Sequence, residues 1–505
     1  MSDARPEEEL GAAVAHGVRW MSAARVTIEI LMLVSMVVLT RLISPADFGR
    51  FAVALIVAEL AMAVPGEGVG SALVQRDRTS REHLQAGLFL SLASAVILTG
   101  LFLLLARFVL PSIFGTGTAD LVRLMTPMFL IAAPSVVPMA ILRRNLDFRR
   151  LSIIDISTAV TRGATSVALA IAGLNGEALV LGVLAATVVG TLAALCSVPL
   201  VLPVPRRSAI RDISGYGGPA SLAAMSWIGF RNCDYAIVSA RLGVLQAGYY
   251  FRAYTLAVEY QRKISVIMYQ VAFPVLSRTT SSEQLLDMRA RMVRVLTVTL
   301  FPFLAILAIV APIVVPALFG PQWTPAIVPT QILVIAGAST LVIDAVGATL
   351  MASGRARATL WYGLGHFLAY GAAVFLVTPL GLAAVAAAAA VVHTAFLFVA
   401  YVVMLRGTSE NPLSRLWADT SHALVACAGL AAVALPLDLL LTRSGASGLA
   451  TLVVVAGGGM AGYLLTLRLV FAETWHTLTG MLRALAPQRP AAGRHEPLPN
   501  PGAAG

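Results

Sequence analysis

The sequence predicts an all-α membrane protein of about 14 transmembrane helices, arranged as two pseudo-symmetric six-helix bundles plus two extra C-terminal helices. Three observations predict this fold: the apolar composition, the apolar runs of membrane-spanning length, and a repeat between the two halves. Of the 505 residues, 58% are hydrophobic and 12% are charged, and the mean hydropathy is +0.84. A chain this apolar has too little polar surface to cover a water-soluble globule of its size, so we expect it in a lipid bilayer.

The apolar runs give the expected spans, because a helix that crosses the hydrocarbon core needs about 20 mostly apolar residues. They are 20–42, 51–72, 84–110, 121–142, 153–173 and 178–202, then 216–240, 248–274, 294–318, 326–351, 358–378 and 382–405, then 419–440 and 449–471. The first, fifth, seventh and eighth spans contain charged residues. The pattern predicts an N-terminal lobe at 1–205, a C-terminal lobe at 206–406, two additional spans within 407–480 and a disordered cytoplasmic tail at 481–505.

The arginines sort by loop, which predicts the orientation in the membrane. If the first span leaves the cytoplasm, the even-numbered loops hold most of them, as in "QRDRTSREH", "RRNLDFRR", "RRSAIR" and "SGRARA". The odd-numbered loops, such as "FGTGTAD" and "GLNGE", are short and carry few. By the positive-inside bias, both termini face the cytoplasm. The acidic start "MSDARPEEEL" lacks the basic region of a cleavable signal, so we expect no cleavage.

The stretch "TRLISPADFGRFAVALIVAEL" is partly repeated two hundred residues later in "SARLGVLQAGYYFRAYTLAVEY". The matched identities are Arg41 with Arg241, Leu42 with Leu242, Phe51 with Phe251, and Glu59 with Glu259. Both stretches follow the first span of a six-span set. Because each set has an even number of spans, the two halves share one orientation and are related by an axis along the membrane normal. The stretch 202–219 is the expected linker.

Charged residues inside spans are costly and usually face a bundle interior or a wet cavity. The predicted substrate-binding residues of such a cavity are Arg25, Arg231, Arg252, Arg162 and Lys263, and the predicted counter-ion or coupling residues are Glu29, Glu259, Glu59, Asp155, Asp234 and Asp344. Arginine suits phosphate because its planar fork donates paired hydrogen bonds and stays protonated. The alternative is that these charges form structural ion pairs between helices, or reach the lipid headgroups from the span ends.

Helical spacing predicts how these charges pair. Arg25 with Glu29, Asp155 with Arg162, and Arg231 with Asp234 are each close enough along a helix to share a side. Tyr249, Arg252, Leu256, Glu259 and Lys263 recur at steps of three or four, so Glu259 is the expected counter-ion of Arg252 and Lys263. Glu59 has no basic residue nearby in its own span, which predicts a packing or hinge role or a separate proton site. Asp344 likewise lacks a basic neighbour in its span.

Motifs and composition exclude several functions. There is no nucleotide-binding phosphate loop, HExxH or GxSxG signature, so we expect no enzyme, cofactor or metal. Cys196, Cys233 and Cys427 lie inside apolar runs without metal-like spacing and are expected to be small buried hydrophobes. The net charge of +11 is spread over loops, which predicts contact with anionic membrane lipids and no nucleic acid partner. The glycines of "PGEGVG" follow an apolar helix, so they are expected to break or bend the second span.

Seven stretches, taken in order, resemble the bacterial Wzx-type polysaccharide flippases of the multidrug/oligosaccharidyl-lipid/polysaccharide (MOP) exporter superfamily. They are "GVRWMSAARV", "RLISPADFGRFAVA", "GSALVQR", "RRNLDFRR", "AGYYFRAYTLA", "VAFPVLSR" and "LFGPQWTPA". The resemblance implies an inner-membrane flippase that moves undecaprenyl-pyrophosphate-linked oligosaccharide from the cytoplasmic to the periplasmic leaflet by alternating access. It implies a role in O-antigen, capsule or exopolysaccharide assembly, with a polysaccharide polymerase and a chain-length regulator as candidate partners. The family has no fixed binding motif to transfer, so the site residues above rest on their own chemistry.

Two other functions compete with this interpretation. A multidrug or cation antiporter of the same superfamily (MATE-like) would favour unpaired carboxylates in an apolar cavity, whereas this chain has several arginines within its spans. A membrane polymerase or ligase acting on the same saccharides would need a sizeable outer loop to carry its chemistry. The odd-numbered loops are too short for that.

The predicted orientation is tested by reporter fusions along the chain. Fusions after residues 80, 147, 209 and 355 are expected to report a cytoplasmic location, because the arginine-rich loops stay inside. Fusions after residues 116, 175 and 380 are expected to report a periplasmic location. The inverse pattern of activity would contradict the orientation assigned to both halves.

Overall fold

The structure is a computed structural model that describes residues 5–76, 79–199, 201–262, 282–353, 355–406, 409–445 and 448–485. Within these ranges every regular element is a helix. The first half contains α1 (Arg5–Leu42), α2 (Pro45–Ala63), η1 (Val64–Gly70), α3 (Ser71–Gln75), α4 (Arg81–Phe108), α5 (Leu110–Phe114), α6 (Thr116–Met125), α7 (Pro127–Ala132), η2 (Ala133–Ser135), α8 (Val136–Arg144), α9 (Phe148–Ile171) and α10 (Gly176–Ser197). The rest contains α11 (Arg207–Leu242), α12 (Val244–Tyr254), η3 (Thr255–Glu259), α14 (Ser282–Phe319), η4 (Pro321–Ala326), α15 (Ile327–Ala352), α16 (Ala356–Val377), η5 (Thr378–Leu380), α17 (Leu382–Met404), α18 (Pro412–Arg443), α19 (Gly448–Val470) and α20 (Ala472–Leu485).

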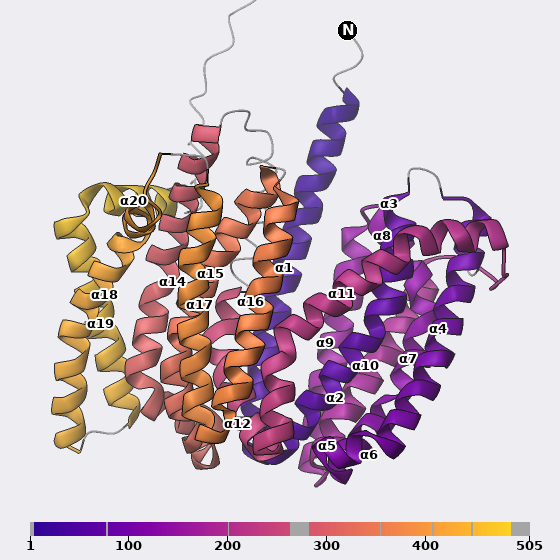
Figure 1. Cartoon of the computed structure of the whole chain (residues 1–505), viewed down its shortest axis with the longest axis horizontal. Helices are drawn as coiled ribbons and strands as arrows, with labels where there is room; N and C mark the ends of the chain where they lie inside the picture. Colours follow the sequence, from indigo (N-terminus) through magenta and orange to yellow (C-terminus); the bar gives the residue numbers. More distant parts are fainter. Residues whose placement is uncertain are drawn as a thin grey trace, which may run out of the picture.

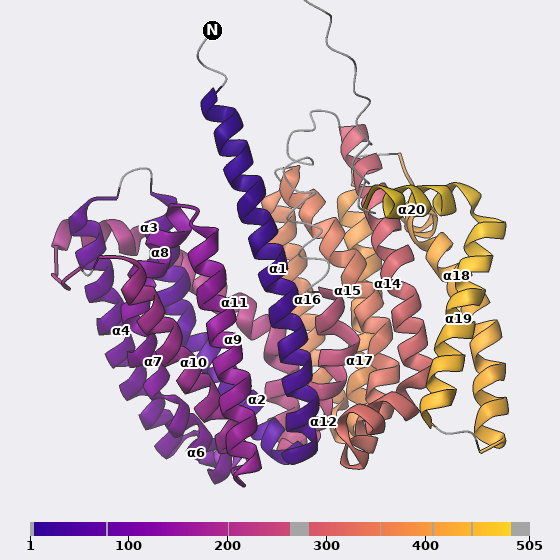
Figure 2. The ribbon, with the colours of Figure 1, turned by 180° about the vertical axis from the view of Figure 1, so that it is seen from behind.

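The helices form two groups that stand side by side. Figure 1 shows α2 to α10 on one side and α12 with α14 to α19 on the other, while α11 crosses from the first group to the second. Seen from behind, α1 lies between the groups (Figure 2). It packs against α9 of the first group and touches α14 of the second.

Ten helical stretches of the described residues are long and apolar enough to cross a membrane. They are 45–75, 81–108, 116–144, 176–197, 286–319, 321–347, 357–380, 382–404, 412–443 and 448–470. Three of the four other expected spans fall on α1, α9 and α11, which are helical but carry charges, as α9 carries Asp155 and Arg162. The eighth expected span, 248–274, is helical as far as residue 262, and its remainder lies outside the described residues. The chain is therefore an all-helical multi-pass membrane protein. The total of about 14 spans and the lobe boundaries at 205 and 406 stay predictions.

The odd-numbered loops lie together at one end of the molecule, called here the odd-loop end. The described glycines with positive φ all lie in these turns: Gly115, Gly173, Gly243, Gly320, Gly381 and Gly445. Such turns need the left-handed backbone that glycine adopts without steric cost. The beginning of α1 and the whole of α20 lie at the opposite end (Figure 1).

Each half contains a π-helical segment. The α-helix of the second span is interrupted at the expected glycines, because α2 continues into the π-helical segment η1, which holds the glycines of "PGEGVG". In the second half, α12 continues into the π-helical segment η3, which the shift of two hundred aligns with residues of α2 and not with η1. A π-turn widens the helix and changes the direction of the side chains that follow it. In each half, the helix that follows the first long span therefore changes helical phase, at positions that differ between the halves.

The two halves meet at the odd-loop end through their equivalent helices α2 and α12. A Cβ atom added to Gly49 of α2 would collide with the carbonyl oxygen of Val244, the first residue of α12. A Cβ atom added to Gly248 of α12 would collide with the carbonyl oxygen of Pro45, the first residue of α2. The contact is reciprocal, and only glycine lets the two backbones approach this closely.

Side-chain hydrogen bonds between α1 and the second group add to this contact. Arg41, in the last turn of α1, donates to the carbonyl oxygens of Ala317 and Leu318 at the end of α14. The indole Nε1 of the fully buried Trp323 donates to the carbonyl oxygen of Thr40 at 2.9 Å. The odd-loop end is thus closed by glycine packing and by hydrogen bonds that cross between the groups.

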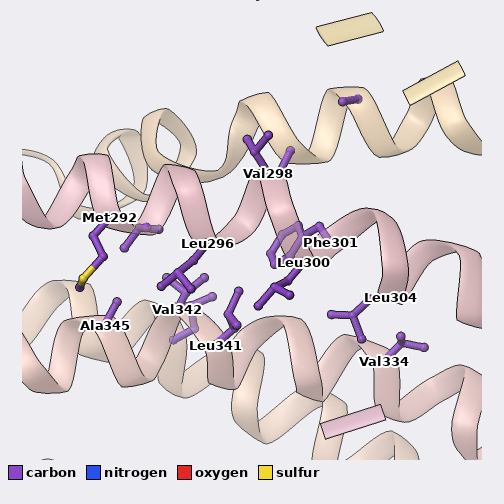
Figure 3. Packing of buried hydrophobic residues seen from close by; sticks show 14 of the residues in the cluster. Met292, Leu296, Val298, Leu300, Phe301, Leu304, Val334, Leu341, Val342 and Ala345 are labelled. Atoms are coloured by element: carbon purple, nitrogen blue, oxygen red, sulfur yellow. The ribbon is translucent and has the colours of Figure 1, made fainter. Parts of the chain in front are cut away.

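The second group has its own apolar core, built along α14. Met292, Leu296, Leu300 and Leu304 follow one another at steps of four and face α15, as Figure 3 shows. Their partners on α15 are Ala345, Val342, Leu341 and Val334. This spacing places one continuous apolar stripe of α14 against α15.

The core also contains an ion pair that sequence analysis missed. Arg289 of α14 lies 2.7 Å from Asp419 of α18, and both side chains are almost fully buried. Tyr401 of α17 donates to Asp419 at 2.7 Å and accepts from Arg289 at 2.9 Å. The pair joins α18 to α14 and α17. Residue 289 lies in what the sequence pattern treats as a cytoplasmic loop, so nothing in the pattern marks it as buried.

Alanine substitutions test the reciprocal glycine contact. Gly49→Ala is expected to destabilise the protein by about 1–3 kcal/mol, because the new methyl group overpacks α12. Gly100→Ala in α4 is the matched control, since a Cβ atom there meets nothing within 4 Å. The control is expected to be neutral or to stabilise by up to about 1 kcal/mol through helix propensity. Thermal unfolding in detergent measures both, and equal tolerance of the two substitutions would refute the contact.

Candidate functional site

Two cavities adjoin along α1 and α9 and share Met32, Ala159 and Arg162 in their linings. The outer cavity, of about 490 Å³, is bounded by α1, α8, α9 and α10 and is lined in part by Arg25 and Asp155. The inner cavity, of about 300 Å³, is bounded by α1, α2, α9, α12 and η3 and is lined in part by Glu59 and Arg252. The inner cavity therefore takes its lining from both copies of the repeat.

Arg252 is the most enclosed cation of the inner cavity. Its residue is 3% exposed, and its Nε is buried without a hydrogen-bond partner in the described structure. The guanidinium carbon lies 4.5 Å from the centre of the Phe48 ring and 5.5 Å from that of Trp323. Phe319 and Phe251 lie at 5.6 and 5.7 Å. Aromatic faces stabilise a cation without neutralising its charge, so Arg252 keeps the capacity to bind an anion.

Arg162 stands at the junction of the two cavities. It lines both, and no carboxylate of the described residues lies within ion-pair distance of it. The charge of Glu59 acts on it electrostatically. The two adjoining cavities are together called here the cationic tract. Arg162 and Arg252 provide two permanently charged guanidiniums to this tract, from opposite halves of the repeat.

Glu59 has a basic partner on a helix of the other half, and its predicted packing, hinge or proton-site role stays a prediction. Its Oε2 lies 3.3 Å from Nη2 of Arg231 on α11, and both side chains are about one-third exposed. Arg231 lines neither of the two cavities described here. The partner lies on another helix, so the spacing of residues within the second span cannot predict it.

Glu259 is not the counter-ion of Arg252, which corrects a second prediction. The described residues show no ion pair between them, although they lie seven positions apart on one chain segment. The physical reason is η3, because its π-helical turns break the steps of three and four on which a shared face depends. Lys263, the other expected partner, lies outside the described residues.

Asp234 and Arg231 were expected on one side of α11, yet they serve different partners. Asp234 is fully buried and accepts from the hydroxyls of Tyr370 at 2.7 Å and Tyr250 at 2.9 Å. It also accepts from the backbone N–H of Tyr235. The carboxylate therefore joins α11, α12 and α16 inside the second group, away from the cavity tract.

The remaining predicted residues are placed as follows. Arg25 and Glu29 form the expected pair at 3.4 Å, with Arg25 more than half exposed. Asp155 and Arg162 line the outer cavity together. Asp344 has a basic partner after all, because Arg262 Nε lies 3.8 Å from its carboxylate. In the described residues, no group of three or more His, Cys, Asp or Glu side chains could hold a metal ion.

Sequence comparisons connect the chain with proteins of polysaccharide biosynthesis. A family model described as "Polysaccharide biosynthesis protein" matches residues 38–328, more than half of the chain. The chain is similar to the lipopolysaccharide biosynthesis protein WzxC of Escherichia coli (strain K12), with 26% identity over 67% of this chain and 70% of the relative. It is also similar to the teichuronic acid biosynthesis protein TuaB of Bacillus subtilis (strain 168), with 24% identity over 73% of this chain and 77% of the relative.

Structural comparisons show the fold. The lipid II flippase MurJ, in an inward closed conformation, superposes with a TM-score of 0.69 and 12% identity, covering 90% of this chain and 99% of that one. An inward-facing multidrug resistance MATE family transporter of the MOP superfamily superposes with a TM-score of 0.58 and 15% identity, covering 76% and 96%. The chain thus has the fold shared by these transporters.

A double-mutant cycle tests the ion pair that joins the halves. Glu59→Gln and Arg231→Gln each remove one partner, and the double variant removes both. Because the pair is partly exposed, a coupling energy of about 0.2–1 kcal/mol is expected. Thermal unfolding of the purified protein measures it. Strictly additive effects of the two single substitutions would show that the charges do not interact.

Proposed function

Because the chain belongs to the polysaccharide biosynthesis protein family, we propose that it moves undecaprenyl-pyrophosphate-linked oligosaccharide from the cytoplasmic to the periplasmic leaflet of the bacterial inner membrane. The chain is a Wzx-like transporter of the MOP superfamily and not an enzyme. The product of the proposed pathway is O-antigen, capsule or exopolysaccharide. The proposed partners are the lipid-linked substrate, the surrounding lipids, and a polymerase with its chain-length regulator.

One observation carries the proposal: Arg162 and Arg252 face one tract from opposite halves, and neither is neutralised by an ion pair in the described structure. An uncompensated guanidinium at membrane depth is costly unless it has an anionic ligand or water. A pyrophosphate carries several acceptor oxygens in the arrangement that two arginine forks favour. An anionic headgroup therefore suits this tract, whereas a cationic drug would be repelled by it.

The closed odd-loop end supports alternating access as the mechanism. With the orientation proposed from the loop arginines, this end faces the periplasm and the observed conformation is closed on that side. Substrate then enters from the cytoplasmic leaflet. Separation of α2 from α12, with closure at the opposite end, would release it on the periplasmic side. In this proposal the lobes at 1–205 and 206–406 move against each other, and the helices within 407–480 move with the second lobe through the buried Arg289–Asp419 pair.

Complementation in cells that lack the native gene tests the proposal. Arg252→Ala is expected to reduce surface polysaccharide at least about tenfold, because a charge-assisted hydrogen bond of about 1.5–3 kcal/mol is lost. Undecaprenyl-linked precursor is expected to accumulate in the inner leaflet. Arg252→Lys is expected to restore part of the activity, since it keeps the charge but loses the fork.

The control is Arg107→Ala, an exposed arginine in the last turn of α4, which is expected to leave polysaccharide unchanged. Membrane levels of each variant are measured by immunoblot. Full surface polysaccharide from the Arg162→Ala, Arg252→Ala double variant would overturn the proposed site. Raised tolerance to lipophilic cations, with no effect of the protein on polysaccharide, would favour the antiporter instead.

A further inference from the structure

We infer that the outer cavity is a carbohydrate subsite, in which Asp155 and a set of threonine and serine hydroxyls hold the sugar next to the pyrophosphate. This inference rests on the proposed function, since it assigns one part of the proposed substrate to one cavity. The volume of about 490 Å³ lies within the range of about 300–1,000 Å³ that ligand cavities usually span. The cavity is therefore large enough for a small saccharide.

The polar lining of the outer cavity adds hydroxyl groups and a carboxylate to its two arginines, Arg162 and Arg25, of which Arg25 is paired with Glu29. Ser135, Thr158, Thr187 and Thr191 contribute hydroxyl groups, and Asp155 contributes a carboxylate. Thr158 and Thr187 each donate their own hydroxyl proton to a carbonyl oxygen one turn back in their helix, at 2.8 Å. Their oxygens are left as acceptors facing the cavity. Sugar hydroxyls donate hydrogen bonds, so a cavity rich in acceptors is complementary to them.

Asp155 differs from Glu59, the carboxylate of the inner cavity, in its pairing. It is exposed within the outer cavity and forms no ion pair with any described residue. A carboxylate accepts hydrogen bonds from two neighbouring hydroxyls of a sugar, but it repels a phosphate. In the inner cavity, by contrast, the carboxylate of Glu59 is engaged with Arg231, and the rest of the polar lining is dominated by Arg162 and Arg252.

The two cavities also lie in the order that the substrate requires. Asp155 is about 10 Å and Arg162 about 21 Å from the start of α9, at 1.5 Å per residue. The outer cavity is therefore nearer the end opposite the odd-loop end. The inner cavity reaches Phe48 and Phe51 near the odd-loop end. In a cytoplasmic leaflet the pyrophosphate of a lipid-linked saccharide lies deeper than its sugar. Arg162, which lines both cavities, is placed where the phosphate joins the sugar.

Binding of two probes to the purified full-length protein, measured by native mass spectrometry, separates the subsites. One probe is undecaprenyl pyrophosphate, and the other is the saccharide-bearing undecaprenyl lipid fraction extracted from the cells that make the protein. Asp155→Asn is expected to weaken binding of the saccharide-bearing lipid by about tenfold, because it loses the charged acceptor. It is expected to leave undecaprenyl pyrophosphate within about twofold of wild type or to strengthen it, since a repelling charge is gone. Thr187→Val is expected to act in the same direction and more weakly.

The matched control is Asp120→Asn, an exposed carboxylate near the odd-loop end, which is expected to change neither affinity. Arg252→Ala is expected to weaken both probes together. An Asp155→Asn variant that binds both lipids like wild type, or that loses both equally, would overturn the carbohydrate subsite and leave the proposed function standing. Failure of the wild-type protein to bind either lipid would instead overturn the proposed function, and the subsite with it.

Discussion

The close approach of Gly49 and Gly248 is the constraint on which the arrangement of the two halves depends. Each glycine meets the first carbonyl of the partner helix, so α2 and α12 are held backbone to backbone at the odd-loop end. The hydrogen bonds from Arg41 of α1 to the end of α14, and from Trp323 to Thr40 of α1, reinforce the same end. Because the halves are fixed there, the inner cavity lies next to this glycine contact, between α1, α2 and α12. The same two helices then continue as π-helical segments, one carrying Glu259.

Charges within the spans divide into two kinds by their partners. Arg289 with Asp419, and Asp234 with Tyr250 and Tyr370, find their partners inside one group of helices and hold that group together. Arg252 is enclosed by aromatic rings instead, and Arg162 projects where two cavities join. A buried charge that the protein itself leaves unpaired is one for which a ligand can supply the partner. This division separates residues that maintain the fold from those that we assign to substrate.

The sequence predicted the positions of the helices better than the ion-pair partners of the charged side chains. The spans follow from hydropathy, because lipid forces every backbone group into internal hydrogen bonds, and the described parts of the four charged spans are helical. The repeat was visible in Arg41 and Arg241. The partner of Glu59 was not, since Arg231 lies 172 positions away. Glu259 was misplaced because a π-turn leaves no clear signal in the residues. Arg289 was missed because an arginine near a span end is usually exposed.

The central claim is that the cationic tract carries a pyrophosphate-linked saccharide across the bilayer. Its most direct measurement uses proteoliposomes loaded with undecaprenyl-pyrophosphate-linked saccharide in which the sugar of one leaflet is accessible to an added lectin. With the wild-type protein, the accessible fraction is expected to change with time as sugars cross, and with Arg252→Ala it is expected to follow protein-free vesicles. A wild-type protein that leaves the accessible fraction as it is in protein-free vesicles would contradict the account.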